Sequence, residues 1–152
     1  MLSEDSLKKK FKSVFIASDH GGVDLKSHLI GRFPFIPWMD LGPLSSESVD
    51  YPDYAAKLCS ELKPHLQDSR GILICGSGQG MAIRANRFPY IRAALCWNEE
   101  VVRLAREHND ANVLCLGGRL VSAPLAERIL TLFLQTEFEG GRHQRRVDKL
   151  NC

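Results

Sequence analysis

The sequence lacks several patterns that would set a chain of 152 residues apart from ordinary globular proteins. It has no apolar run near the ~20 residues that a membrane-spanning helix needs, no Asn-x-Ser/Thr sequon and no internal repeat. Basic and acidic residues nearly balance, with 20 Lys+Arg against 18 Asp+Glu and a net charge of +2. We therefore expect one globular domain that binds neither membranes nor nucleic acids.

Cysteines are few, and their spacing forms no known motif. There are five, an odd number, and no two lie in a Cys-x-x-Cys pair, which excludes a zinc knuckle and a thioredoxin-type redox motif. Cys96 and Cys115 lie within apolar runs, which predicts small buried side chains. The first residues mix acids with lysines, unlike a signal peptide, so we expect a cytoplasmic protein.

Short apolar runs alternate with amphipathic stretches along the chain. Strands that are apolar on both faces and alternate with helices indicate a parallel sheet covered on each side by helices, an α/β fold. Pro37 predicts that the second strand lies at an edge of the sheet, and Ser122 is a plausible N-cap. The predicted strands are 14–17, 35–39, 71–75, 92–96 and 112–116. The predicted helices are 23–29, one that starts within Asp50-Tyr-Pro-Asp53 and runs to 62, a short one through 86, 99–107, 122–138 and a basic segment after 141.

A glycine-rich loop, Gly76-Ser-Gly-Gln-Gly80, follows the third predicted strand and precedes a helix. Ligands of such folds bind beyond the carboxyl ends of the strands, where backbone N–H groups can hold an anion or a developing oxyanion. Met81 stands where a dinucleotide fingerprint needs glycine, and no Gly-Lys-Ser/Thr follows, so neither nucleotide motif is present. The loop alone is equally consistent with a tight turn.

Cys75 strengthens the case for a site because it ends the strand directly before this loop. A thiol at a helix N-terminus has a lowered pKa and can act as a nucleophile or as a general base. His108, in a His-Asn-Asp sequence after a helix, leaves a Cys-His hydrolase open as an interpretation. Asp19 and His20 follow the first strand and therefore belong to the same ligand-facing edge.

The C-terminal segment is basic. Arg142 and Arg146 are four residues apart and would share one helix face, which suits a phosphate dianion, while Arg145 and Lys149 form a second stripe. The alternative reading is a solvated basic end of a helix. Arg119, after the fifth strand, joins these arginines only if the segment folds back or reaches a partner chain.

Five blocks, in order along the chain, resemble the ribose-5-phosphate isomerase B family, which also contains the galactose-6-phosphate isomerase subunits. The resemblance runs from about residue 14 to 150, nearly the whole chain. The blocks are Ala17-Ser-Asp-His-Gly-Gly22, Ser48-Val-Asp-Tyr-Pro-Asp-Tyr-Ala55, Gly71-Ile-Leu-Ile-Cys-Gly-Ser-Gly-Gln-Gly80, His108-Asn-Asp-Ala-Asn-Val113 and Glu139-Gly-Gly-Arg-His-Gln-Arg-Arg146.

The resemblance implies a fold and an activity. The fold would be a single-domain, Rossmann-like three-layer α/β/α sandwich with a five-stranded, mostly parallel sheet over residues 1–152, including an N-terminal extension (1–12) and a C-terminal basic segment (140–152). The activity would be the interconversion of ribose 5-phosphate and ribulose 5-phosphate through a cis-enediolate in the pentose phosphate pathway, without metal or cofactor. The partner would be a second copy in a homodimer with shared active sites, sometimes paired into a tetramer.

The resemblance also implies roles for particular residues. Cys75 would be the base that moves a proton between C2 and C1, and His108 would help to open the furanose ring, assisted by Asp19 and Ser77. His108 and Asn109, a substrate contact, would come from the partner's half of the site. The backbone amides of Gly76, Ser77, Gly78, Gln79 and Gly80 would hold the enediolate, and His20, Arg119, Arg142 and Arg146 would clamp the phosphate.

Two alternatives stay open beside this expectation. A hexose-6-phosphate isomerase of the same family is one, although that branch generally needs two different subunits and usually lacks this cysteine. A sugar-phosphate-binding domain without turnover is the other, although the set Asp19, Cys75, Ser77 and His108 is intact. Relatives without the cysteine use a glutamate beyond the loop, whereas residues 81–84 here are Met-Ala-Ile-Arg, which indicates the cysteine-using branch.

Overall fold

The structure, a computed structural model, describes residues 3–151 and contains one five-stranded sheet in which every strand pairs in parallel. The strand order is β2-β1-β3-β5-β4. The chain places β2 on one side of β1 and β3 on the other, so the strand order reverses between β1 and β3. In such sheets the crevice at this reversal is where ligands bind. The strands are β1 (Ser13–Ser18), β2 (Trp38–Asp40), β3 (Ser69–Cys75), β4 (Ala93–Leu95) and β5 (Val113–Gly117).

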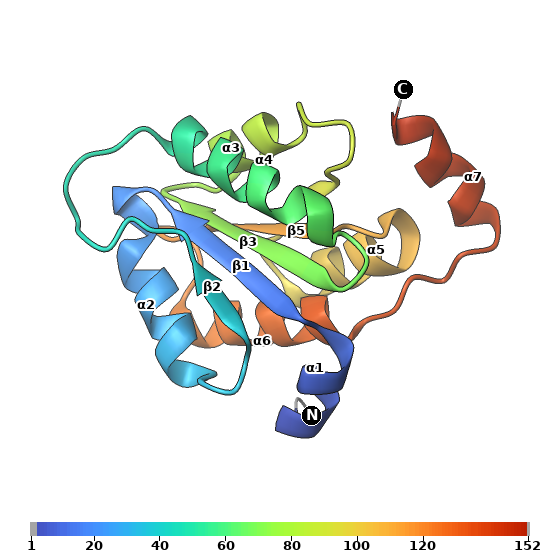
Figure 1. The fold of residues 1–152 in the computed structure, drawn as a ribbon, viewed down its shortest axis with the longest axis horizontal. Coiled ribbons are helices and arrows are strands. Elements are labelled where there is room, and N and C mark those ends of the chain that lie inside the picture. Colours follow the sequence, from blue (N-terminus) through green and yellow to red (C-terminus); the bar gives the residue numbers. More distant parts are fainter. Residues whose placement is uncertain (1–2, 152) are drawn as a thin grey trace.

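Helices cover both faces of the sheet and make three layers (Figure 1). One face packs against α1 (Glu4–Lys10), α2 (Val23–Arg32), α5 (Glu99–Asn109) and α6 (Ala123–Gln135), and the other against α3 (Tyr51–Leu62) and α4 (Gln79–Ala85). The last helix, α7 (Arg142–Asp148), lies at the right of Figure 1, beside α5 and apart from the two helix layers. The predicted α/β sandwich is confirmed.

The alternation of side chains along the central strands builds a core on each face of the sheet. In β3, Ile72 and Ile74 belong to the core under α2 and α6, whereas Leu73 and Cys75 face α3 and α4. Burying an aliphatic side chain of this size contributes about 1.5–3 kcal/mol. Because both faces are buried, the strand is apolar from Gly71 to Cys75, as the sequence predicted.

The predicted elements are confirmed with small differences at their ends. β2 is an edge strand, as Pro37 indicated, but it comprises Trp38–Asp40 rather than residues 35–39, because residues 34–36 form a turn and a bend. Ser122 caps α6, its Oγ accepting from Leu125 N at 3.3 Å. This helix ends at Gln135 rather than near 138, because Thr136 adopts an extended conformation and its carbonyl accepts a hydrogen bond from Arg106 Nε at 3.1 Å.

The N-terminal extension holds a helix that the sequence analysis did not predict. Ser3 caps α1, accepting a hydrogen bond from Ser6 N at 3.3 Å, and Leu7 and Phe11 are buried in the core beneath it. Two apolar side chains in a short, lysine-rich stretch give too little periodicity to indicate a helix. The extension is therefore packed on the domain.

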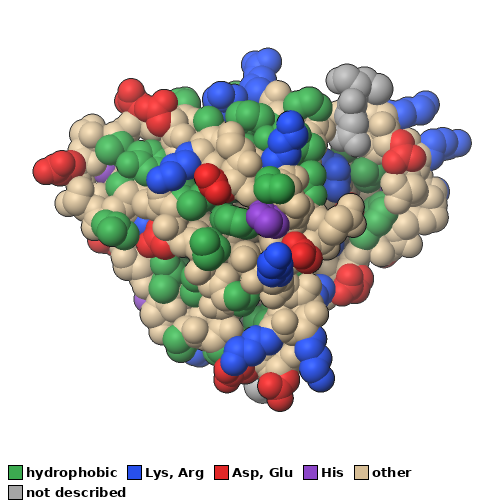
Figure 2. Space-filling model, viewed as in Figure 1, with side chains coloured by type: hydrophobic (Ala, Val, Ile, Leu, Met, Phe, Trp, Pro, Cys, Tyr) green, Lys and Arg blue, Asp and Glu red, His purple; other side chains and the backbone are tan. Residues whose placement is uncertain are grey.

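The surface agrees with the small net charge. On the face shown in Figure 2, basic and acidic side chains are interspersed. None of the helices described for residues 3–151 has both the length and the apolar character to span a membrane.

Candidate active site

A cavity of about 480 Å³ opens at the carboxyl end of the sheet, beyond the ends of the neighbouring strands β1 and β3. It brings together residues from three strand ends and from the start of α3, which are far apart in the sequence. Its lining is Asp19, Tyr51, Cys75, Gly76, Ser77, Gly80, Arg119 and Leu120.

Cys75 is the nucleophilic side chain of this cavity. It is the last residue of β3, and its Sγ accepts a hydrogen bond from Gly78 N, the N-cap of α4, at 3.1 Å. This hydrogen bond holds the Cys75 thiol beside the start of α4. The structure thus places Cys75 at the strand end and beside the helix start that the sequence indicated.

The remaining described cysteines have a different environment. Burial raises the pKa of Cys59 and of Cys96 to about 12, and it raises the pKa of Cys115, which lies in the middle of the sheet, well above its ordinary value. These thiols stay protonated and act as small apolar side chains, which confirms the prediction for Cys96 and Cys115.

The loop after Cys75 is fixed by its glycines and presents free backbone donors. Gly78 has a φ of +78°, and a Cβ there would lie 2.6 Å from the Leu95 side chain, so no other residue fits. The Gln79 amide donates to Ser77 Oγ at 3.3 Å, and the Gln79 side chain is exposed. Within residues 3–151, the amides of Gly76, Ser77 and Gly80 have no acceptor. These three amides can bind an oxyanion.

Asp19 and Arg119 bring opposite charges to the same cavity. Asp19 is 8% exposed, and its Oδ1 accepts from Gly21 N at 2.8 Å. The Arg119 backbone N–H donates to Gly76 O at 3.0 Å, and its guanidinium lies against Gly76, where a Cβ would come within 3.2 Å of Nη1. One cationic side chain is thus held directly beside the glycine-rich loop.

Three further residues complete this end of the molecule. Tyr51 and Leu120 line the cavity, and sequence reasoning gave them no role. The only signal for Tyr51 in the sequence was its position at a predicted helix start. In the structure its ring packs on Gly80, where a Cβ would lie 2.5 Å from the ring. His20 does not line the cavity: its Nδ1 lies 3.2 Å from both the N and the O of Val49.

His108 and Asn109 lie at the opposite end of the sheet. Helix α5 starts at the N-cap Asn98, directly after β4, and returns to Asp110, directly before β5. Since all strands are parallel, this crossover carries the chain from the carboxyl end to the amino end. His108, in the last turn, is therefore displaced from the Cys75 end by about 16 Å, the length of an 11-residue helix. The chain contains no Cys75–His108 pair, so a Cys-His hydrolase within one chain is excluded.

Two arginines hold the turn that carries His108. Arg106 Nη1 donates to Asp110 Oδ1 at 2.9 Å, and Arg92 Nε donates to the carbonyls of Asn109 and Asp110 at 3.1 and 3.0 Å. Asp110 itself has a φ of +46° and ends the helix. His108 stands against α7, where its ring stacks on His143 with 4.2 Å between the ring centroids.

Helix α7 carries the basic residues expected to clamp a phosphate. Arg142 and Arg146 are exposed and share one face, as predicted, beside the buried stripe of His143 and Val147. Neither arginine forms an ion pair with any residue in the part of the chain that the structure describes. The helix lies beside α5 and does not fold back to the Cys75 cavity, so these arginines do not join Arg119 within one chain.

Metal-ligating side chains gather next to this turn. The potential ligand atoms of His108, Glu139 and His143 all lie within 4.8 Å of one another. Sequence reasoning expected no metal, and the three positions show no spacing that indicates a site, because the fold alone brings α5 and α7 together.

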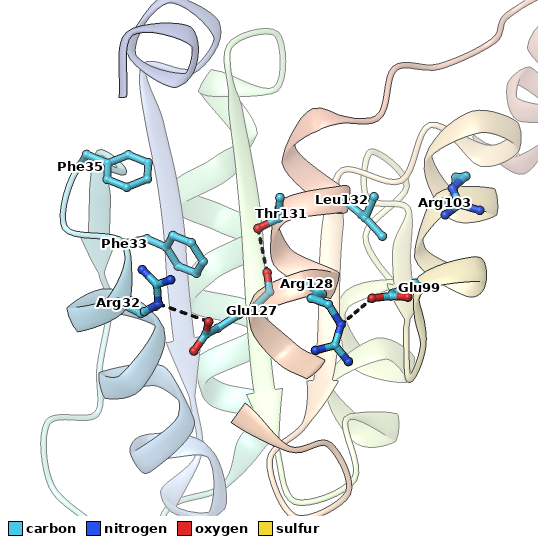
Figure 3. Close-up of a pocket in the computed structure, with 9 residues that line it drawn as sticks. All are labelled: Arg32, Phe33, Phe35, Glu99, Arg103, Glu127, Arg128, Thr131 and Leu132. Atoms are coloured by element: carbon cyan, nitrogen blue, oxygen red, sulfur yellow. Dashed lines mark hydrogen bonds and ion pairs between the residues drawn. The ribbon is translucent and has the colours of Figure 1, made fainter. Parts of the chain in front are cut away.

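A larger hollow, of about 650 Å³, lies on the outer surface of the helix layer formed by α2, α5 and α6 (Figure 3). Its acids are already paired: Glu127 with Arg32 at 3.3 Å and Glu99 with Arg128 at 2.5 Å. It is lined by no cysteine or histidine and lies away from the strand ends. The smaller cavity at Cys75 is the better candidate for chemistry.

Comparisons with known proteins match this chain over nearly its whole length. A family model described as Ribose/Galactose Isomerase matches residues 14–150. Ribose-5-phosphate isomerase B of Escherichia coli is 41% identical over 145 residues, 93% of this chain and 95% of that protein. The solved ribose 5-phosphate isomerase of Thermotoga maritima is 48% identical, with a TM-score of 0.88 over 91% of this chain and 97% of its own. The Mycoplasma genitalium enzyme, solved with bound ribulose-5-phosphate, is 42% identical, with a TM-score of 0.88 over 91% and 93% of the two chains.

Proposed function

This chain belongs to the ribose/galactose isomerase family, and from that premise we propose that it interconverts ribose 5-phosphate and ribulose 5-phosphate. The observation that carries the proposal is the arrangement at the end of β3, where the Cys75 thiol lies beside free backbone amides and one arginine in a single cavity. A proton-transfer isomerase needs one base and a cradle for the charge that develops on the sugar oxygens.

In the proposed reaction, the Cys75 thiolate takes the proton from C2 of the open-chain aldose. The electron pair of the broken C–H bond forms the C1–C2 double bond, and negative charge moves to O1. The same thiol then returns the proton to C1, while the hydroxyl proton passes from O2 to the neighbouring O1. The free amides of Gly76, Ser77 and Gly80 support this step, because each donor aimed at the enediolate contributes about 3 kcal/mol in comparable oxyanion sites.

The rest of the proposed site comes from a second copy of the chain. Ring opening needs a group that exchanges protons with O1 and O4 of the furanose, a role for which we propose His108, assisted by Asp19 and Ser77. His108 and Asn109 lie at the amino end of the sheet, away from the cavity of their own chain. A two-fold dimer that sets the amino end of one copy against the carboxyl end of the other supplies both halves twice.

The phosphate is proposed to bind between the same two halves. Arg119 lines the cavity beside Cys75, and Arg142 and Arg146 lie on α7, the helix whose His143 stacks on His108. Planar guanidinium groups bind phosphate oxygens in bidentate pairs, which anchors the substrate while C1 and C2 react. His20 supports this clamp from the start of α2, through its contact with the segment before α3.

The test is formation of ribulose 5-phosphate from ribose 5-phosphate, with EDTA present, by the wild type, Cys75→Ala and Cys59→Ala. We expect the wild type and Cys59→Ala to turn over alike, because Cys59 is a buried core thiol. Cys75→Ala should lose roughly 100- to 10,000-fold in kcat while it still binds substrate, as expected for a lost general base.

Other outcomes contradict the proposal. A wild type that is stabilised by ribose 5-phosphate without turnover is a binding domain, and one that turns over only hexose 6-phosphates belongs to the other branch of the family. An active Cys75→Ala variant means that another group is the base.

A further inference from the structure

Three side chains from three separate segments meet beside α7 and form a cluster outside the Cys75 cavity. His108 comes from the last turn of α5, Glu139 from the segment between α6 and α7, and His143 from the first turn of α7. Their potential ligand atoms lie within 4.8 Å of one another, and His143 Nε2 is 3.4 Å from Glu139 Oε2. We call these residues the His108 cluster.

The composition of the His108 cluster suits one class of metal ion. Two imidazole nitrogens and one carboxylate, with a fourth position left open, are a ligand set typical of Zn²⁺ and of its neighbours Co²⁺, Ni²⁺ and Cu²⁺. Mg²⁺ and Ca²⁺ prefer oxygen ligands and do not match it. Ligand atoms about 2.0–2.1 Å from a shared tetrahedral ion lie roughly 3.4 Å apart. The pair formed by Glu139 and His143 already has this separation.

Contacts within the chain hold the three residues of the cluster close together. The Glu139 backbone N–H donates to Glu107 O at 3.0 Å, which ties the carboxylate directly beside His108. His143 is buried, and its ring lies 11° from parallel with that of His108. Binding therefore requires the two rings to tilt until their lone pairs point at one atom, while the backbone of all three segments stays in place.

We propose that the His108 cluster binds one Zn²⁺-like ion and that the bound ion inhibits the enzyme. A nitrogen that coordinates Zn²⁺ has given its lone pair to the metal and no longer exchanges a proton with substrate. The ion would also fasten α7, and with it Arg142 and Arg146, to the end of α5. The inhibitory part rests on the proposed function, in which His108 opens the sugar ring, whereas the metal site itself does not.

Binding is tested first, on the full-length protein after removal of metals with EDTA and dialysis. Calorimetric titration with Zn²⁺ should show one ion per chain. Glu139→Gln should weaken binding at least ~10-fold, because loss of a direct ligand costs no less than loss of its supporting hydrogen bond. Glu137→Gln is the matched control: it makes the same change two residues away, at a side chain that pairs with Lys10 at 2.5 Å, and it should bind as the wild type does.

The identity of the ligands is tested with Co²⁺ in place of Zn²⁺. Nitrogen and oxygen ligands give visible d–d bands without the intense near-ultraviolet charge-transfer band of a thiolate. A thiolate band would show that a cysteine holds the ion and would overturn the site, as would a Zn²⁺ affinity that Glu139→Gln leaves unchanged or an absence of binding.

Inhibition is then measured with the isomerase assay. Zn²⁺ should lower the rate of the wild type and of Glu137→Gln, and EDTA should restore it. Glu139→Gln should keep the rate of the metal-free wild type and need at least ~10-fold more Zn²⁺ for the same inhibition. A wild type that binds Zn²⁺ at full activity overturns the inhibitory part. A protein with no isomerase activity even in EDTA overturns the proposed function, while the titrations still decide the metal site.

Discussion

The two ends of the sheet carry the two halves of the candidate site, and they are built in opposite ways. At the carboxyl end, Cys75 and Asp19 are nearly buried and belong to strands or to turns directly after strands. At the amino end, Asn109, Arg142 and Arg146 are exposed, and the arginines lie on a seven-residue helix beyond the two helix layers.

The space around two glycines shows how differently the two ends are packed. At Gly78, in the carboxyl half, a Cβ would collide with Leu95 and with the backbone of Leu116 at 2.6 and 2.8 Å. At Gly140, which precedes α7, nothing lies within 4 Å of the position that a Cβ would take. The carboxyl half is fixed by the core, as a base and an oxyanion cradle require. Helix α7, which carries the arginines of the amino half, lies apart from the two helix layers, and this suits the proposed docking on a second chain.

Among substitutions in the amino half, His108→Asn should have the largest effect on activity, and it tests whether this end of the sheet takes part in the reaction. If His108 serves a partner's cavity, kcat should fall roughly 100-fold or more, the contribution of a general acid–base group. If His108 only stacks on His143, activity should be unchanged and the melting temperature alone should move. Steady-state kinetics beside a thermal melt of the same variant separate these results.

Arg142→Ala and Arg146→Ala test whether the arginines of the amino half bind the substrate phosphate. Loss of one charged hydrogen bond to phosphate, worth about 1.5–3 kcal/mol, should raise KM roughly 10- to 100-fold, with a smaller effect on kcat. Arg145→Ala, on the other stripe of α7, is the matched control and should leave KM unchanged. Equal effects at all three arginines would indicate general charge attraction rather than a clamp.

The smallest expected effect is a change in the free energy of unfolding. It is measured by thermal or denaturant unfolding of two glycine variants, one from each end of the sheet. Gly78→Ala should destabilise the fold by more than the ~1–2 kcal/mol cost of a left-handed alanine, because its Cβ also meets Leu95. Gly140→Ala, with a φ of +65° and open space around it, should cost only the conformational part. Equal losses would show that the two ends are packed alike.

The carboxyl half could be predicted from the sequence because it depends on local signals. Strand 71–75 is apolar throughout, the glycine-rich loop follows it, and the parallel topology then determines that Cys75 and Asp19 share an edge. Ser122 was predicted as an N-cap for the same reason, since capping depends on residues within one turn.

The amino half could not be predicted in this way, because its position depends on the path of the whole chain. Sequence spacing puts Arg142 and Arg146 on one face, but it does not decide whether the segment folds back toward Arg119. Tyr51, Leu120 and the His108 cluster were missed for the same reason, as each owes its neighbours to tertiary packing. Helix α1 was missed because Leu7 and Phe11 carry too little periodicity.

The most direct test of the shared site is to mix two inactive variants, Cys75→Ala and His108→Asn, under conditions that exchange subunits. In a mixed dimer one site carries both substitutions and the other carries neither. Random exchange should therefore restore about one quarter of the wild-type activity, because half the dimers are mixed and each has one intact site. If the activity of the mixture stays at the average of the two variants, the halves do not combine between chains, and the account of a shared site is wrong.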